Sequence, residues 1–521
     1  GSQALLNNST AAYNTAVGMQ ALKQNLTGQV NTAVGAFALK TNTTGTDNVA
    51  MGCGAMCLNT TGASNVAIGL NAMCVNTIGA NNVAMGRNAL LANIEGDCNV
   101  AIGKQALDSN TTADNNTAVG AASLGANTTG AENTATGMTA LAANTTGGTN
   151  TASGFRSLLT NTTGSDNSAF GSKALASATT ASNNTAVGAS ALFANTTGTP
   201  NTAVGTNALK SNTTGATNTA IGYNALDANT TGGTNTAVGH NSLGANTTAG
   251  SNTAVGGNTL SANVTGQFNT AVGYDALLLT TSSYNTAVGI DSLRLNTSGA
   301  SNTAIGRATL DANTTASNNT AVGDSALGAN TTGAINTAVG FSALQANITG
   351  TQNVAMGAYA LYVNTVSQNT AVGVEALSTS TTGVNNVAVG FEAARNSTTA
   401  ANTTAIGFCA LRTNTTGTSN TALGQSSLKA NTTANENVAI GQNAMAANTT
   451  GASNVAVGQA ALDANTTASN NTAVGKSALG ANTTGTGNVA IGESAASSQT
   501  DAGNNVAVGR DSLLCNISGG N

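Results

Sequence analysis

The sequence predicts an all-β protein, a parallel β-solenoid of about thirty coils of 17 residues each. Three observations predict this fold class. The pentapeptide Asn-Thr-Ala-Val-Gly, or a close variant of it, recurs at an interval of 17 residues between Asn14 and Asn505. The repeat is too short for a pair of packed helices, and it is rich in β-branched and turn-forming residues. Charged residues are absent from the pentapeptide in every copy.

The full repeat reads Asn-[Thr/Val]-Ala-[Val/Ile/Met]-Gly-x-x-Ala-Leu-x-Ala-Asn-Thr-Thr-Gly-x-x, and its residues are numbered here as positions 1 to 17. Position 3 is Ala and position 5 is Gly in all thirty copies, and position 9 is Leu or Met except at Ala394 and Ala496. One residue is missing before Asn285 and one before Asn369. This spacing predicts one continuous array over residues 1–521 without separate domains. Since neither end shows a capping repeat, we expect a segment of a longer chain.

Each part of the repeat predicts one part of a coil. Positions 1–5 predict a short strand ended by a Gly that adopts a turn conformation. Positions 8–11 predict a second short segment, and Asn-Thr-Thr-Gly predicts the turn that closes the coil. The missing residues fall in that turn, as in Leu279–Tyr284, where a loop tolerates a deletion.

The placement of charge predicts which residues face water. The chain has 14 basic and 19 acidic residues, and they occur at positions such as 6, 7, 10, 14, 16 and 17 but never at 1–5. Because strand side chains alternate, both faces of the strand are then protected from water. One face should line the coil with the Leu of position 9, so that each coil buries about one Val and one Leu. The other should pack against equivalent strands of sister chains in a homotrimer, where the small Ala of position 3 permits close approach.

Several copies resemble a known surface-protein motif. Asn81–Gly86, Ser64–Gly69 and Asn504–Gly509 are similar to the Asn-Ser-Val-Ala-Ile-Gly signature of trimeric autotransporter adhesin heads. Similar arrays occur in phage tail-fibre proteins, and the resemblance covers essentially the whole chain. It implies a trimeric, left-handed parallel β-roll with a role in surface attachment. The repeat of this chain is longer than that of the head family.

Residues for catalysis or metal binding are not predicted. His240 is the single histidine and lies at a variable position, so no Ser/His/Asp or Cys/His group can be assembled. Acidic residues do not recur from coil to coil, which disfavours a calcium ladder and the carboxylate pairs of a carbohydrate-active enzyme. We therefore expect a non-enzyme without catalytic, cofactor-binding or metal sites. The net charge of −5 and the lack of a long apolar run predict neither nucleic-acid binding nor membrane insertion.

Two features leave alternatives open. Cys57 and Cys74 occupy the same position in adjacent repeats and should stack about 4.8 Å apart, either as a disulfide or as a chance pair. The Asn-Thr-Thr turn is formally an N-glycosylation acceptor, although repeated turn chemistry also explains it. The cysteines without such a neighbour are Cys53, Cys98, Cys409 and Cys515. Aromatic residues at position 6 predict no compact receptor patch, and they include Phe155, Tyr223, Tyr274, Phe341 and Phe391.

The repeat pattern favours a structural role. The leading hypothesis is an extracellular fibre on a cell surface or virion, either a phage tail-fibre shaft or a bacterial adhesin, about 145 Å long at about 4.8 Å a coil. A receptor or glycan would be bound by regions outside this segment. The alternative is an ice-binding solenoid, in which stacked Asn-Thr-Thr turns form a regular array of threonines.

Overall fold

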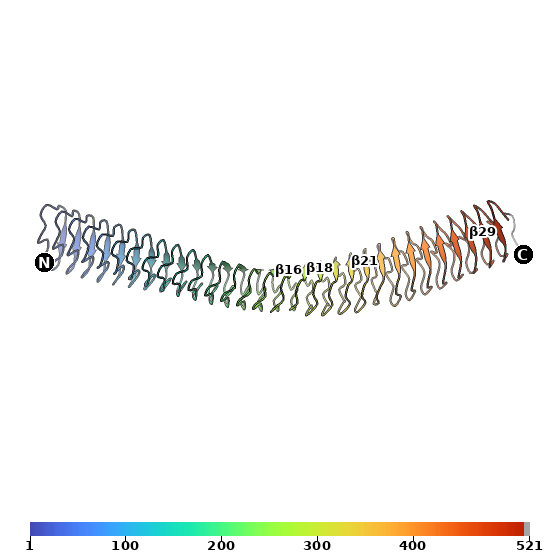
Figure 1. Cartoon of the computed structure of the whole chain (residues 1–521), viewed down its shortest axis with the longest axis horizontal. Helices are drawn as coiled ribbons and strands as arrows, with labels where there is room; N and C mark the ends of the chain where they lie inside the picture. The colour runs from blue at the N-terminus through green and yellow to red at the C-terminus, as the bar shows by residue number, and fades with distance from the viewer. Residues whose placement is uncertain (515–521) are drawn as a thin grey trace. The chain divides into compact units, whose positions relative to one another are not determined.

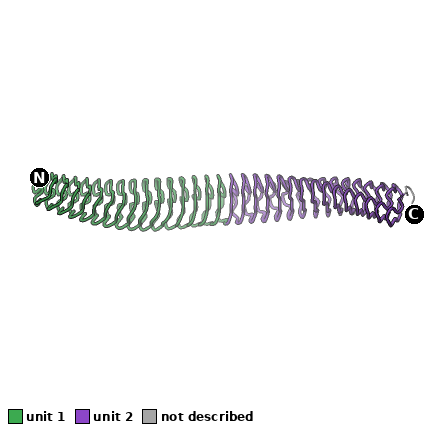
Figure 2. The backbone as a smooth tube through the Cα atoms, turned by 90° about the horizontal axis from the view of Figure 1, so that it is seen from above, with its two compact units in different colours: residues 1–267 green, residues 268–521 purple. Residues whose placement is uncertain are grey.

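The computed structural model describes residues 1–514 and has the predicted parallel β-solenoid fold. Thirty strands lie in these residues, one for each coil, and no helix is present among them. The chain divides into unit 1, Gly1–Gln267, and unit 2, Phe268–Asn521 (Figure 2). Within each unit successive strands lie side by side, and the strands of unit 2 that are labelled in Figure 1 are β16 (Thr270–Val272), β18 (Thr303–Ile305), β21 (Val354–Met356) and β29 (Val489–Ile491).

Unit 1 contains β1 (Thr15–Val17), β2 (Thr32–Val34), β3 (Val49–Met51), β4 (Val66–Ile68), β5 (Val83–Met85), β6 (Val100–Ile102), β7 (Thr117–Val119), β8 (Thr134–Thr136), β9 (Thr151–Ser153), β10 (Ser168–Phe170), β11 (Thr185–Val187), β12 (Asn201–Val204), β13 (Asn218–Ile221), β14 (Thr236–Val238) and β15 (Thr253–Val255). Unit 2 contains β16 (Thr270–Val272), β17 (Thr286–Val288), β18 (Thr303–Ile305), β19 (Thr320–Val322), β20 (Thr337–Val339), β21 (Val354–Met356), β22 (Thr370–Val372), β23 (Val387–Val389), β24 (Thr404–Ile406), β25 (Thr421–Leu423), β26 (Val438–Ile440), β27 (Val455–Val457), β28 (Thr472–Val474), β29 (Val489–Ile491) and β30 (Val506–Val508). Neighbouring strands pair in parallel, with equivalent repeat positions opposite one another, as Ala33 and Ala50 are.

The strands are shorter than the sequence predicts. They cover positions 2–4 of most repeats rather than 1–5, and positions 8–11, the predicted second short segment, form a turn. The cause lies in the backbone, because positions 7, 9 and 17 adopt positive φ, as at Phe37 (63°), Leu39 (46°) and Asp47 (59°). Left-handed residues of this kind turn the chain sharply. The Leu of position 9 thus lies at a corner, with its side chain buried in the coil.

The interior of the coil differs from the prediction at two positions. Ala33 of position 3 is buried, whereas Val34 of position 4 points outward and is only half-buried. The expected burial of one Val per coil and the expected placement of Ala between chains were therefore wrong. Since strand side chains alternate, an inward Ala at position 3 places positions 2 and 4 outside. The buried core consists of Ala at positions 3 and 8 and Leu or Met at position 9.

Two ladders of buried asparagine also run through the coils. At position 12, the Asn42 Nδ2 donates to the Asn25 Oδ1 at 2.8 Å and to the Gly45 carbonyl oxygen at 3.0 Å. At position 1, the Asn31 Nδ2 donates to the same Gly45 carbonyl at 2.9 Å, and its Oδ1 accepts from the backbone N–H of Asn48 at 3.0 Å. Buried polar groups are stable when they are hydrogen-bonded in this way. The ladders bind each coil to its neighbours and fix the position of the closing turn.

The 16-residue coils keep this register, and the prediction that the missing residues belong to the turn is confirmed. The backbone N–H of Asn285 donates to the Asn269 Oδ1 at 2.9 Å, although only 16 residues separate them. In the second short coil, the side chains of Asn353 and Asn364 both donate to the Val366 carbonyl, at 2.8 and 2.7 Å. Val366 therefore takes the role of Gly at position 15, and the coil loses a residue only from the turn before it.

Candidate functional surface

The outward side of the strands forms a continuous uncharged surface within each unit. We call the side chains of positions 2 and 4 the sheet face. Position 2 carries Thr, Val or, once, Ser168, and position 4 carries an apolar residue except at Thr136 and Ser153. Large apolar side chains on this face remain open to water, with Met51 42% and Ile305 41% exposed. Soluble proteins rarely expose a long row of large apolar side chains, which makes this face a candidate contact surface.

The threonines of the closing turn are only partly available for binding. The hydroxyl of position 13 donates to the backbone carbonyl of the next coil, as from Thr43 to Thr60 at 3.0 Å and from Thr60 to Thr77 at 2.9 Å. Position 14 is exposed, but residues such as Ile78 and Glu95 interrupt its threonines. The turns therefore do not present two complete rows of unoccupied hydroxyl groups.

Charged residues in unit 2 form a network that the sequence analysis did not identify. Arg395 contacts Glu375 through its Nε at 2.6 Å and Glu392 through its Nη1 at 3.0 Å. The Nε of Arg412 contacts the other oxygen of Glu392 at 2.7 Å. Both acids lie at position 7 of adjacent coils and the arginines at position 10, so acidic residues do recur here, contrary to the expectation from sequence, and the repeat numbering contained the signal for their stacking. Each of these carboxylates contacts a guanidinium group, so the network links neighbouring coils.

Several aromatic residues contact another ring, in the adjacent coil or, for Tyr359 and Tyr362, in the same coil. Phe341 contacts Tyr359 edge to face with ring centres 5.2 Å apart, and Tyr359 contacts Tyr362 in the same way at 5.4 Å. Phe391 stacks on Phe408 at 5.5 Å, and Tyr223 stacks on His240 at 5.6 Å. The last contact places the single histidine beside a ring rather than beside a nucleophile. Such pairs add about 0.5–1.5 kcal/mol each beyond burial, and they strengthen the stacking of coils.

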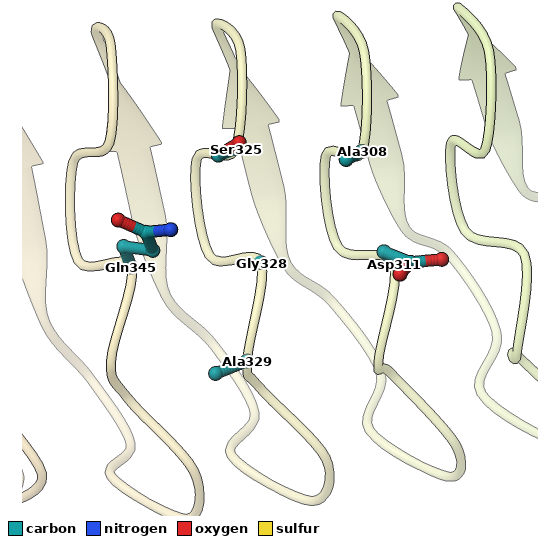
Figure 3. Close-up of a pocket in the computed structure, with 6 residues that line it drawn as sticks. All are labelled: Ala308, Asp311, Ser325, Gly328, Ala329 and Gln345. Carbon is teal, nitrogen blue, oxygen red and sulfur yellow. The ribbon is translucent and has the colours of Figure 1, made fainter.

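Two hollows on the surface of unit 2 are lined by few charged side chains. One hollow of about 250 Å³ lies over successive coils of unit 2, where Asp311 and Gln345 supply polar side chains (Figure 3). The Asp311 carboxylate is paired with the Nε of Arg294 at 2.9 Å. A second hollow, of about 360 Å³, lies beside Tyr359 and the Glu375–Arg395 ion pair. Neither contains two unpaired carboxylates, which hydrolysis of a glycosidic bond would require.

Within residues 1–514 no three His, Cys, Asp or Glu side chains are grouped closely enough to hold a metal ion. A search of the same residues finds no helix with the length and apolar character needed to cross a membrane. No protein-family model matches the chain, and no curated protein matches its sequence. The sheet face is therefore the candidate functional surface.

Proposed function

We propose that this chain is the shaft of an extracellular fibre, of the kind found in phage tail fibres and bacterial surface adhesins, and that it acts as a homotrimer. The observation that carries the proposal is the uncharged sheet face along each unit. Three parallel copies that pack these faces around a common axis would remove the apolar side chains of position 4 from water. Each buried methylene group would contribute about 0.8 kcal/mol.

The distribution of charge supports the same assembly. The ion pairs of unit 2 involve positions 6, 7 and 10, away from the sheet face, and would stay in water around the trimer. Repeated contacts between coils, made by the strands and the asparagine ladders, suit a stiff spacer that holds a binding region away from a surface. The absence of a predicted catalytic group is consistent with a passive shaft.

The assembly is tested by the mass of the purified chain in solution. Sedimentation equilibrium or light scattering should give three times the chain mass of 50.2 kDa, independent of salt because the contact is apolar. Electron cryomicroscopy should then show three solenoids in cross-section with their sheet faces inward. A monomer at micromolar concentration, with the sheet face in water, would refute the trimer.

Ice binding is the second candidate, and one observation favours a new location for it. The threonines of position 2 point outward and lie in register from strand to strand, as Thr219 and Thr236 do, and Thr occupies this position in 19 of the thirty copies. A trimer that covers the sheet face would leave them no access to ice. Thermal hysteresis measured on the same sample separates the candidates, because a shaft shows none.

A further inference from the structure

Two cysteine side chains meet between adjacent coils of unit 1. Cys57 and Cys74 both occupy position 10, and their Sγ atoms lie 2.7 Å apart. The stacking of coils sets this proximity, since the backbone N–H of Leu58 donates to the Cys74 carbonyl at 2.9 Å. Both side chains are free thiols and half-buried, so small reagents can reach them. A coil spacing of about 4.8 Å also falls in the range of Cα separations that a disulfide spans.

The two thiols influence each other's ionisation. The Cys57 thiol donates a hydrogen bond to Cys74, and this lowers the pKa of Cys74 to about 7. The same hydrogen bond, with burial and the neighbouring negative charge, raises the pKa of Cys57. Lys40 at position 10 of the preceding coil opposes that rise, whereas Cys53 adds to it. The pair thus combines one sulfur that ionises near neutral pH with a second sulfur that is held beside it.

We infer that Cys57 and Cys74 form a redox-active pair, which a small-molecule disulfide such as oxidised glutathione converts into a covalent link between two coils. The Cys74 thiolate attacks oxidised glutathione, so that a bond from Cys74 to one glutathione sulfur forms while the original S–S bond breaks and a glutathione thiolate leaves. Cys57 then attacks the Cys74 Sγ, the mixed disulfide breaks, and the second glutathione leaves as a thiolate. The proton of Cys57 passes to a departing thiolate. Two protein thiols are oxidised, and one glutathione disulfide is reduced to two thiols.

Among the described residues the other cysteines lack this arrangement. Cys53 and Cys98 are exposed, and neither has a cysteine at the same position of an adjacent coil. Cys409 is buried, and its Sγ lies 3.6 Å from a Glu392 carboxylate oxygen. Burial, and then the negative charge of that carboxylate, raises the pKa of the thiol. Cys515 lies outside the described residues. The inference does not depend on the proposed fibre function.

The experiment treats the full-length chain with oxidised glutathione, caps the remaining thiols with N-ethylmaleimide in denaturant, and analyses tryptic fragments by mass spectrometry. Lys40 and Arg87 bound a fragment, residues 41–87, that contains Cys53, Cys57 and Cys74 and no other cleavage site. We expect this fragment to carry one N-ethylmaleimide group, on Cys53. Its mass should be two hydrogen atoms below that of the fragment with one N-ethylmaleimide group and two free thiols. The rate should rise about tenfold between pH 6 and pH 8, because the Cys74 thiolate is the attacking group. A fragment with three caps would overturn the inference.

Two variants identify the bond. In Cys53→Ser the fragment should still lose two hydrogens, because the exposed thiol takes no part. In Cys57→Ser the reaction should stop at the mixed disulfide, so that Cys74 retains glutathione. Loss of the bond in Cys53→Ser, or a cross-linked dimer on a non-reducing gel, would contradict an intrachain Cys57–Cys74 link. Cys98, in the fragment of residues 88–104, serves as the exposed single-thiol control.

Discussion

At the residue scale, the glycine of position 5 combines a left-handed backbone with a close contact. Gly120 has φ of 138°, and a Cβ built on it would overlap the carbonyl oxygen of Gly137 in the next coil. Gly125 of the same coil has room, because its nearest neighbour, the Ala122 carbonyl oxygen, would lie 3.4 Å from a Cβ. The recurrence of position 5 predicted a turn, but the contact with the next coil depends on the stacking distance and was not predicted.

We expect Gly120→Ala to destabilise its coil by about 1–3 kcal/mol, since the new methyl group is strained by both φ and the neighbouring backbone. Hydrogen exchange measures this locally through the Gly137 amide, which donates to the Val119 carbonyl at 2.7 Å. Gly125→Ala should leave the exchange rate nearly unchanged. Equal protection in the two variants would show that the backbone relaxes without cost.

The asparagine ladder yields a second residue-scale prediction. Asn133→Ala would remove the Oδ1 that accepts from the backbone N–H of Asn150 at 3.0 Å. The loss should cost about 1–3 kcal/mol, because a buried donor is left without its partner. The Asn150 amide should then exchange about tenfold faster or more, whereas the exposed Thr129→Ala should have no effect. An unchanged Asn150 amide would mean that another acceptor replaces the side chain.

The burial of these asparagines was not predicted from sequence. Asn is usually exposed and favours turns, so positions 1 and 12 were interpreted as a strand start and a turn. The signal was the near-invariance of position 1, where only Thr403 replaces Asn. The Oγ1 of Thr403 donates to the Asn386 Oδ1 at 2.6 Å, which keeps one contact of the ladder.

At the scale of the element, the alternation of side chains along the strand determines which positions point into the coil. Sequence placed an uncharged strand at each pentapeptide, and the structure confirms it at positions 2–4. Which side chains point inward was predicted wrongly, because Val is more apolar than Ala and appeared the better core residue. The buried core is filled instead by Ala at positions 3 and 8 and by Leu or Met at position 9.

The sheet face provides a prediction at this scale. In Val238→Glu, a charge at position 4 of β14 would face the same charge in two sister chains, so the trimer should weaken while the coil keeps its fold. The matched control is Thr231→Glu, at exposed position 14, where Glu95 occurs naturally. Light scattering should report dissociation only for Val238→Glu, with unchanged circular dichroism. An unchanged mass for both variants would exclude this face from the assembly.

At the scale of the whole molecule, the small number of ionisable groups predicts stability in acid. Burial raises the pKa of Asp108, Asp227 and Asp463 at position 10, so the folded chain holds their protons more tightly than the unfolded chain. Stability at these sites rises as pH falls through their folded pKa values. The effect of pH at Asp324 is opposite. Ser325 and Arg307 lower the pKa of Asp324, so its contribution to stability is lost as pH falls.

We therefore expect the β-sheet signal in circular dichroism to persist from pH 7 to about pH 3, with no cooperative acid transition. Asp227→Asn should raise stability slightly at pH 7 and leave it unchanged near pH 3, where the natural carboxyl group is protonated. Denaturant titrations at both pH values would check this. A sharp loss of the β-sheet signal near pH 4 would contradict this expectation. It would show that carboxylates in ion pairs supply a large part of the stability of the folded chain.

The fold of the whole molecule was predictable because one pattern recurs thirty times, and each copy supports the same assignment. The trimer, the left hand of the coil and the surface role remain predictions, since they depend on partners or on resemblance. The contacts of Glu375, Glu392 and Arg395 follow from the coil-to-coil stacking that the repeat numbering implies. Their side-chain conformations do not follow from that numbering.

The 16-residue coils carry a genetic consequence. The backbone N–H groups of Asn285 and Asn369 donate to the asparagine of the preceding coil although that coil is one residue shorter. A coil therefore packs on its neighbour through strand and asparagine contacts that do not depend on its number of residues. The asparagine contact of position 1 is therefore the same at both coil lengths. Recombination between repeats of the gene would add or remove whole coils without creating a new kind of junction, and the length of the protein could change within a population while its architecture is inherited intact.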